Sequence, residues 1–168
     1  MIIKIQNFEI DLSKPIDISI PITNDEQNPI AWYQNAPEIK PVVMGDWIGK
    51  VSEGKSSTNF NNLFFNPHAH GTHTECLGHI TKEFYSINQC LQQFFFWATL
   101  ITILPKKVEE NLVISKSQIE KALKLVYNSE LKTEAIVIRT LPNEISKKSL
   151  KYSNTNPPFL SEEAALFL

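Results

Sequence analysis

Four histidines fall within one short stretch of this chain, residues 66–80, which reads NPHAHGTHTECLGHI. This stretch holds every histidine of the protein, together with one carboxylate and one of the two cysteines. A hydrophobic core does not explain a row of polar imidazole rings, because burying polar groups is costly. Neutral imidazole and carboxylate are, however, the usual ligands of zinc-type ions. The stretch therefore predicts a metal site, and its candidate side chains are His68, His70, His73, Glu75, Cys76 and His79.

The spacing of these residues indicates which of them could bind one ion. His73 and Glu75 are two residues apart, so on an extended segment both side chains leave the same face. Gly71 precedes them and predicts a bend that a residue with a Cβ would resist. A third ligand could be His68 or His70; His68 is preferred because it directly follows a proline in the expected loop. Three protein ligands leave a position open for water, as catalytic zinc sites do.

Cys76 has an alternative interpretation as a nucleophile, because a cysteine beside a histidine can form a catalytic pair. The sequence shows no third group that would orient such a pair. We therefore expect Cys76 to be a small side chain that packs beneath the metal-binding loop.

The same residues carry a resemblance to a known family. His68, the segment Gly-Thr-His-Thr-Glu that ends at Glu75, and His79 resemble the motif His-x-Gly-Thr-His-x-Asp-x-x-x-His of metal-dependent cyclases and arylformamidases. Flanking segments are similar as well. Residues 17–22 resemble the family's opening Asp-Leu-Ser-x-Pro-Leu, Trp32 resembles the tryptophan that follows it, and residues 138–140 resemble a later strand that ends in Arg-Thr.

The resemblance implies an α/β fold of the swivelling β/β/α type, in which a mixed β-sheet forms a barrel-like core with flanking helices. It implies one cyclase-like domain over residues 1–168, and a divalent metal held by His68, His73 and Glu75, with zinc expected and manganese as the alternative. Glu75 could also bridge two ions, as the family's aspartate does.

The implied activity is that of a metal-dependent amide hydrolase or cyclase, similar to an arylformamidase. Metal-bound hydroxide would attack the carbonyl of a small amide, formamide, lactam or lactone. His79 would be the general acid and base that takes the proton from water and passes it to the leaving amine. Trp32 would contact the substrate, and N-formylkynurenine and related aryl amides are the candidate substrates.

Three departures from the family pattern are visible. Glu75 replaces the family's aspartate, and His68 lies five residues before His73 where the family has four. A longer carboxylate arm and one extra loop residue would together restore the geometry. Family members also continue beyond the point that corresponds to Leu168, with a strand and a segment that adds a histidine and a glutamate to the metal centre. We therefore expect a chain truncated at its C-terminus; the alternative function is a non-catalytic remnant or binding module with an incomplete site.

The composition of the chain limits the class of protein and the kinds of partner it could have. The chain has 168 residues, of which 42% are hydrophobic and 20% charged, and a formal net charge of −2. This balance fits one globular domain and gives no electrostatic basis for binding nucleic acid or an anionic membrane. Two cysteines make no disulfide framework, and no apolar run approaches about 18 residues. We expect a cytoplasmic, homo-oligomeric protein that acts on a small molecule, because members of the resembled family commonly form homodimers.

Hydrophobic patterns predict the elements that position the cluster. The first half is expected to hold a hairpin of residues 2–5 and 8–11 joined by Gln6 and Asn7, a half-buried strand at 16–20, a long loop at 23–41 that carries Trp32, short strands at 42–44 and 47–51 about Gly45, and a strand at 60–65. This last strand would deliver the chain directly into the histidine cluster.

The second half is expected to alternate helices and strands. Predicted are a helix at 86–92, a buried strand at 94–104 with its four aromatic residues in the core, a helix from a capping box at Ser115 and Gln118 to about Tyr127, a parallel strand at 134–139, a polar loop at 147–158, and a last helix capped by Ser161.

Overall fold

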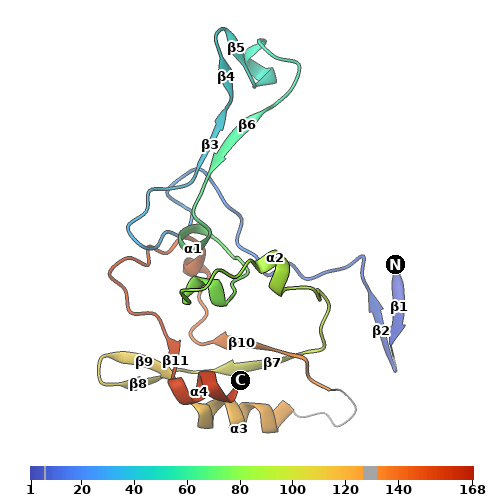
Figure 1. Ribbon diagram of the computed structural model, residues 1–168, viewed down its shortest axis with the longest axis vertical. Coiled ribbons are helices and arrows are strands. Elements are labelled where there is room, and N and C mark those ends of the chain that lie inside the picture. The colour runs from blue at the N-terminus through green and yellow to red at the C-terminus, as the bar shows by residue number, and fades with distance from the viewer. Residues whose placement is uncertain (6, 127–131) are drawn as a thin grey trace.

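The computed structural model describes residues 1–5, 7–126 and 132–168 (Figure 1). Its strands are β1 Ile2–Ile5, β2 Phe8–Asp11, β3 Glu38–Pro41, β4 Val43–Met44, β5 Trp47–Ile48, β6 Asn61–Phe64, β7 Ala98–Ile103, β8 Lys106–Val108, β9 Asn111–Ile114, β10 Ala135–Thr140 and β11 Phe159–Leu160. Its helices are α1 Pro67–His70, α2 Ile87–Cys90, α3 Lys116–Val126 and α4 Glu162–Phe167, with 3-10 turns η1 Val51–Glu53, η2 Leu77–His79 and η3 Ile145–Ser149. The predicted turn residue Gln6 and the predicted helix end at Tyr127 lie outside the described residues.

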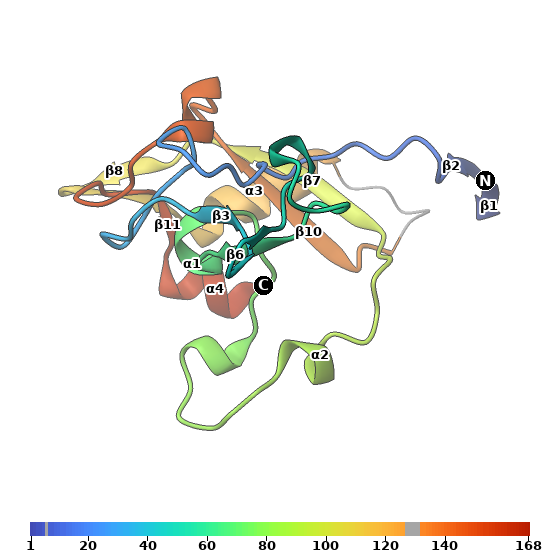
Figure 2. The same ribbon diagram turned by 90° about the horizontal axis from the view of Figure 1, so that it is seen from above.

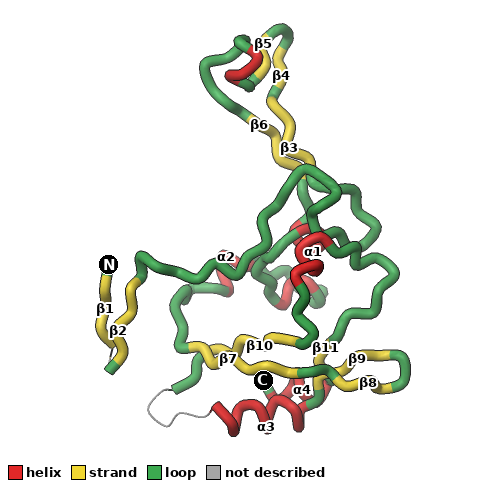
Figure 3. Tube along the Cα trace, turned by 180° about the vertical axis from the view of Figure 1, so that it is seen from behind, coloured by secondary structure: helices red, strands yellow, loops and turns green. Residues whose placement is uncertain are grey.

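The hydrophobic core lies where β7 meets α3 and α4. β7 and β10 pair in parallel, as predicted, in a register that runs from Ala98 opposite Ala135 to Ile103 opposite Thr140. Parallel strands need a long crossover, and the segment that contains α3 supplies it. The two helices lie together beside this strand pair (Figures 1 and 3). The buried residues of this core are Ile101, Ile103, Ile114, Ile119 and Ala164; each isoleucine contributes about 1.5–3 kcal/mol by leaving water.

Both helices at the core begin at the residues that the sequence predicts. Ser115 and Gln118 form a reciprocal capping box: Gln118 Oε1 accepts from the Ser115 N–H at 3.1 Å, and Ser115 Oγ accepts from the Gln118 N–H at 3.4 Å. Ser161 Oγ accepts from the Ala164 N–H at 3.2 Å and caps α4. These caps satisfy backbone donors that the first turn of a helix leaves without partners.

A β-hairpin arm projects away from this core (Figures 1 and 3), and from above it is seen end-on in front of the other elements (Figure 2). β3 pairs antiparallel with β6, and β4 and β5 form a second short ladder at the tip. Gly45 turns the chain there with φ of +58°, which suits a residue without a Cβ. β6 returns from the tip and ends at Phe64, so it leads directly into the histidine cluster, as predicted.

The prediction of a half-buried strand at residues 16–20 is wrong. No strand is assigned there, and Ile16 and Ile18 are 89% and 78% exposed. Asp17 Oδ1 instead accepts hydrogen bonds from the backbone and hydroxyl of Ser19, which also lower the pKa of the Asp17 carboxyl. Such local side-chain bonds compete with strand pairing, and alternation alone could not reveal that no neighbouring strand lies alongside.

The apolar run at 94–104 was predicted to be a strand buried along its length, and this is wrong. Ile101 and Ile103 are buried, but Leu100 and Leu104 are 53% and 63% exposed. The strand begins only at Ala98, while Phe94 and Phe95 are 72% and 79% exposed. Trp97 packs against Phe8 at a ring-centroid distance of 5.6 Å, away from the buried isoleucine cluster. Hydrophobicity reports the tendency to leave water, but the partners that cover a side chain come from elsewhere in the chain.

The α/β class is confirmed, whereas the predicted barrel-like core is not found. The described residues form five small sheets of two or three strands and no closed barrel. The predicted loop at 23–41 is wrong at its end, where β3 lies. The sequence patterns also missed β8, β9 and β11, which form one of these sheets in the order β11-β9-β8. These strands are only two to four residues long, too short for alternation to mark them.

Candidate metal centre

The histidine cluster begins on α1, a single helical turn that its first residues stabilise. Asn66 is the N-cap: its Oδ1 accepts from the His68 N–H at 3.0 Å, and Pro67 follows at the first helical position. The backbone N–H of Asn66 in turn donates to His70 Nδ1 at 2.9 Å. The first bond caps the start of the turn, and the second connects its last residue back to Asn66. The side chain of His68 lies on the exposed side of this turn.

His70 is buried, and both of its ring nitrogens already have protein partners. Because Nδ1 accepts from Asn66, Nε2 must carry the proton that is donated to the Asn35 carbonyl at 2.8 Å. No lone pair of this ring is therefore left for a metal ion. Of the two histidines between which the sequence left a choice, His70 serves the structure and His68 remains free to bind a ligand.

A second buried polar residue connects the segment that carries Trp32 to α1 through hydrogen bonds. Asn28 is almost completely buried; its Nδ2 donates to the His70 carbonyl at 2.8 Å, and its Oδ1 accepts from the Thr23 N–H at 2.9 Å. The Ala31 N–H donates to the Ala69 carbonyl at 3.0 Å. These contacts fix the loop at residues 28–35 beside the histidine cluster.

Replacing His70 with alanine is expected to destabilise the fold while metal binding at saturating metal is kept. The substitution removes a buried ring and its two part-buried hydrogen bonds to the Asn66 N–H and the Asn35 carbonyl, which costs about 1–3 kcal/mol and lowers the melting temperature by roughly 2–12 °C. Thermal melts of metal-free protein measure this, with His68→Ala as the matched control that removes an exposed ring. A His70→Ala protein that melts like the parent but loses its metal would make His70 a ligand.

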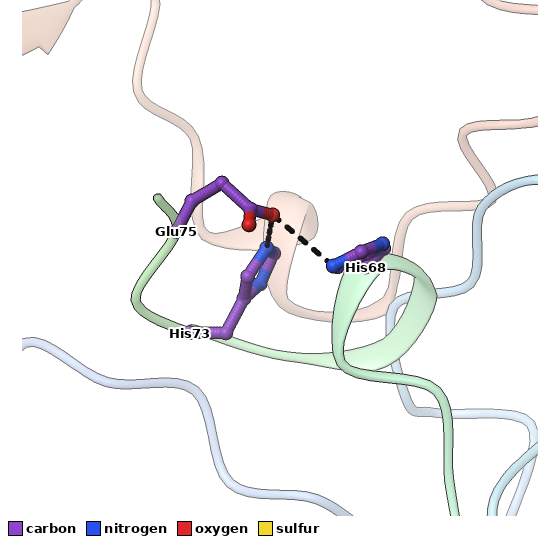
Figure 4. A group of neighbouring side chains, drawn as sticks. All are labelled: His68, His73 and Glu75. Carbon is purple, nitrogen blue, oxygen red and sulfur yellow. Dashed lines mark ion pairs between the residues drawn. The ribbon is translucent and has the colours of Figure 1, made fainter. Parts of the chain in front are cut away.

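The side chain of His68 on α1 points toward those of His73 and Glu75, which follow the helix (Figure 4). One ligand atom from each lies within 4.8 Å of the others, so the group could hold a metal ion. Glu75 Oε2 is 3.1 Å from His68 Nε2 and 3.5 Å from His73 Nε2. The side chains of His73 and Glu75 thus meet on one face, as their spacing predicted.

The tautomer of His73 suits a metal ligand. Its Nδ1 lies 2.9 Å from the Gly71 carbonyl, which can only accept, so Nδ1 carries the proton. In the neutral ring the lone pair is then on Nε2, the nitrogen that faces Glu75. A backbone carbonyl that holds the far nitrogen in this way is a common orienting partner of metal-binding histidines.

Glu75 is held in its charged form. Partial desolvation, the largest single influence, raises the pKa of its carboxyl, but the Cys76 N–H and the fields of His79, His68 and His73 together bring the pKa below its ordinary value. Oε1 accepts from the Cys76 N–H at 3.2 Å, so Oε2 is the oxygen turned toward the imidazoles. The carboxylate is therefore ionised and oriented at neutral pH.

His79 lies beside this group on η2. Its Nδ1 is 3.6 Å from Glu75 Oε2, and its ring stands edge-on to the ring of His68 at a centroid distance of 4.4 Å. The turn before it is pressed against Tyr85: a Cβ on Gly78 would come within 2.5 Å of the Tyr85 carbonyl, so only glycine fits there. Cys76 Sγ donates to the same carbonyl at 3.4 Å. This half-buried thiol thus helps to hold the turn that carries His79.

The bend predicted at Gly71 is present, but the prediction that this bend needs glycine is wrong. Its φ of −162° is extended backbone that any residue adopts, and an added Cβ would make ordinary contact with Ile22 at 3.4 Å or more. The chain therefore bends here without needing a residue that lacks a Cβ, and the approach of His73 to Glu75 depends on the residues that follow.

A cavity of about 650 Å³ adjoins His68. The predicted substrate contact Trp32 lines it, as does its neighbour Tyr33. Sequence reasoning missed the far wall at residues 152–157, because nothing in that polar segment signals that it lies beside Trp32. The complete lining is Ile20, Pro29, Ala31, Trp32, Tyr33, His68, Ala69, His70, Gly71, Thr72, Tyr152, Ser153, Asn154, Thr155 and Pro157.

Comparison with known proteins identifies a family. The family model described as "Putative cyclase" matches residues 10–168, which is most of the chain and includes the cluster, Trp32 and the far wall of the cavity. No curated protein and no solved structure gives a significant match. Among the described residues, no helix is both long and apolar enough to cross a membrane.

Proposed function

The chain belongs to the cyclase family, and from this membership we propose that it is a metal-dependent hydrolase or cyclase that acts on the carbonyl of a small amide, formamide, lactam or lactone. The observation that carries the proposal is the convergence of His68, His73 and Glu75, of which His68 also lines a cavity. A carbonyl compound seated in the cavity would have its reacting end beside these three side chains.

The donor set fits a divalent transition metal. Two imidazole nitrogens and one carboxylate oxygen are a common ligand set of catalytic zinc, and manganese accepts the same donors. His73 presents an unprotonated nitrogen, and Glu75 presents a charged oxygen. A bound ion supplies Lewis acidity to a carbonyl oxygen and acidifies a water molecule. The three side chains are between 31% and 43% exposed, so a substrate can approach them directly.

We assign proton transfer to His79. An imidazole can accept a proton from the attacking water and return it to the leaving nitrogen at neutral pH. His79 Nδ1 lies 3.6 Å from Glu75 Oε2, so the ring is beside the proposed metal ligands, where the reacting water would be. The turn pressed against Tyr85 keeps the ring in place during the reaction.

Hydrolysis of formanilide by the zinc-supplemented protein tests the proposal. We expect aniline release at least about 10-fold faster than with the same protein after chelation and dialysis, because the ion supplies several kcal/mol of charge stabilisation. Zinc added back should restore the rate. Equal rates before and after chelation would favour the alternative, a non-catalytic member of the family.

A further inference from the structure

A second cavity, of about 490 Å³, lies at the N-terminal hairpin formed by β1 and β2. It shares no lining residue with the cavity beside His68. The hairpin lies on the side of the molecule where β7 and β10 begin (Figures 1 and 2). The volume is typical of ligand pockets, which measure about 300–1,000 Å³. The lining residues are Ile3, Ile5, Ile10, Leu12, Phe95, Phe96, Trp97 and Glu134.

The hairpin turns an apolar face to this cavity. In its antiparallel register Ile3 lies opposite Ile10, and the next pair, Lys4 and Glu9, leaves from the other face. Ile3 and Ile10 line the cavity, whereas the exposed Lys4 and Glu9 do not. The charges of the hairpin are therefore kept on the face away from the cavity, and its isoleucines form one part of the cavity wall.

Three consecutive aromatic residues form another part of the wall, namely Phe95, Phe96 and Trp97. Trp97 has two partners that hold it: its ring packs against Phe8 at a centroid distance of 5.6 Å, and its backbone N–H donates to Glu134 Oε2 at 2.9 Å. Phe95 and Phe96 are 79% and 43% exposed, so a ligand can contact their rings. The faces of aromatic rings attract cations as well as apolar groups.

Glu134 is the one ionisable residue among the described residues that line the cavity. Its Oε2 accepts from the Trp97 N–H, and its backbone N–H donates to the Trp97 carbonyl at 2.8 Å, so two bonds hold it beside the aromatic wall. Within residues 1–5, 7–126 and 132–168, no cationic side chain forms an ion pair with this carboxylate. The other oxygen, Oε1, can accept a hydrogen bond from a ligand.

We propose that this cavity binds a primary alkylammonium compound that has an apolar chain or ring. The apolar part lies between the isoleucines of the hairpin and the aromatic residues 95–97, and the ammonium group donates to Glu134 Oε1. A carboxylate ligand of the same size is repelled by Glu134, and a neutral ligand lacks the charge-assisted hydrogen bond. None of the cavity's lining residues belongs to the proposed metal centre, so the inference is independent of the proposed function.

Calorimetric titration of the full chain with three compounds of similar size tests the charge preference. They are 2-phenylethylammonium, 2-phenylethanol and phenylacetate, which are cationic, neutral and anionic at neutral pH. We expect the cation to bind about 10-fold more tightly than the alcohol, and phenylacetate to bind most weakly, because a hydrogen bond to a charged group is the stronger one. Equal affinities for the cation and the alcohol, or no binding of the cation, would overturn the proposal.

A series of alkylamines from propylamine to hexylamine tests the apolar part of the cavity. Each added methylene should tighten binding by about 3- to 4-fold, because it leaves water for the isoleucine and aromatic surface. Affinity that does not rise with chain length would also refute the proposal, because it would reduce the interaction to an ion pair at an exposed carboxylate.

The variant Glu134→Gln tests the proposed partner of the ammonium group, because it removes the charge and keeps an oxygen that can accept the Trp97 N–H. Glu9→Gln is the matched control, since it removes the same charge from the other face of the hairpin. We expect the first variant to weaken 2-phenylethylammonium binding by about 10-fold and to leave 2-phenylethanol unchanged, and the control to change neither. A cation that binds Glu134→Gln as tightly as the parent would contradict the assignment.

Titration of the zinc-loaded protein and of the same protein after chelation separates this cavity from the metal centre. The affinity for 2-phenylethylammonium should be the same in both, because the cavity and the histidine cluster share no residue. Binding that required zinc would place the amine at the metal and overturn the inference. Binding that is kept by a protein without formanilide turnover would refute only the proposed function.

Discussion

Replacing His79 with alanine is expected to lower kcat for formanilide by about 10²–10⁴-fold, the usual contribution of a positioned acid and base. The ring lies beside Glu75, but the proposed role is proton transfer, so zinc content should stay near that of the parent. The measurements are initial rates of aniline release and elemental analysis of the same protein samples.

His79→Gln is the informative companion variant, because glutamine retains a polar side chain but cannot take up a proton at neutral pH. It should be as slow as the alanine variant. Loss of zinc from either variant would instead make His79 a ligand and refute its assignment as the acid and base.

Removing one of the proposed ligands should have the second large effect. His68→Ala and His73→Ala are each expected to weaken zinc affinity by more than about 100-fold, because loss of an orienting partner behind a ligand already costs 10–100-fold. Turnover should fall with metal content. Competition with a chromogenic chelator gives the dissociation constants directly, without any need for activity.

His70→Ala is the matched control for this pair, because it removes the same ring from the same helical turn. Both nitrogens of His70 are bonded to Asn66 and Asn35, so its removal should leave zinc affinity within a few-fold of the parent once the protein is folded. If His70→Ala lost zinc and His68→Ala kept it, the ligand set proposed here would be refuted.

Glu75 provides the remaining test of the site. Glu75→Asp restores the family's carboxylate but shortens the arm by one methylene, while His68 stays five residues from His73. If the longer glutamate side chain compensates for the extra residue between His68 and His73, the Glu75→Asp variant should bind zinc more weakly than the parent. Equal or tighter binding by Glu75→Asp would contradict that compensation, and the same chelator competition measures it.

Much of the local structure followed from the sequence by itself. Ser115 and Ser161 cap their helices where predicted, β7 and β10 pair in parallel, and β6 leads into the cluster. The proximity of His73 to Glu75 was also predicted. Each of these depends on neighbours within a few residues or on regular alternation and crossover length, which the order of residues encodes directly.

Residue type and spacing do not determine which side chains are buried or hydrogen-bonded. The tertiary structure does. His68 and His70 are identical side chains two residues apart, and they differ because the Asn35 carbonyl reaches only one of them. In the same way, Phe94 is apolar but exposed, because no other part of the described chain covers it. Burial and hydrogen bonding depend on segments tens of residues away, and a single sequence does not show which segments those are.

The cavity wall is the clearest case. Trp32 could be suspected as a substrate contact from its loop, but the polar segment at residues 152–157 gave no sign of lying opposite it. The bridge between Ile30 and Lys151 brings them together across more than a hundred residues. The sequence thus determined the chemistry of the candidate ligands, while the tertiary fold decided which histidine has a free ring nitrogen and what kind of surface lies beside it.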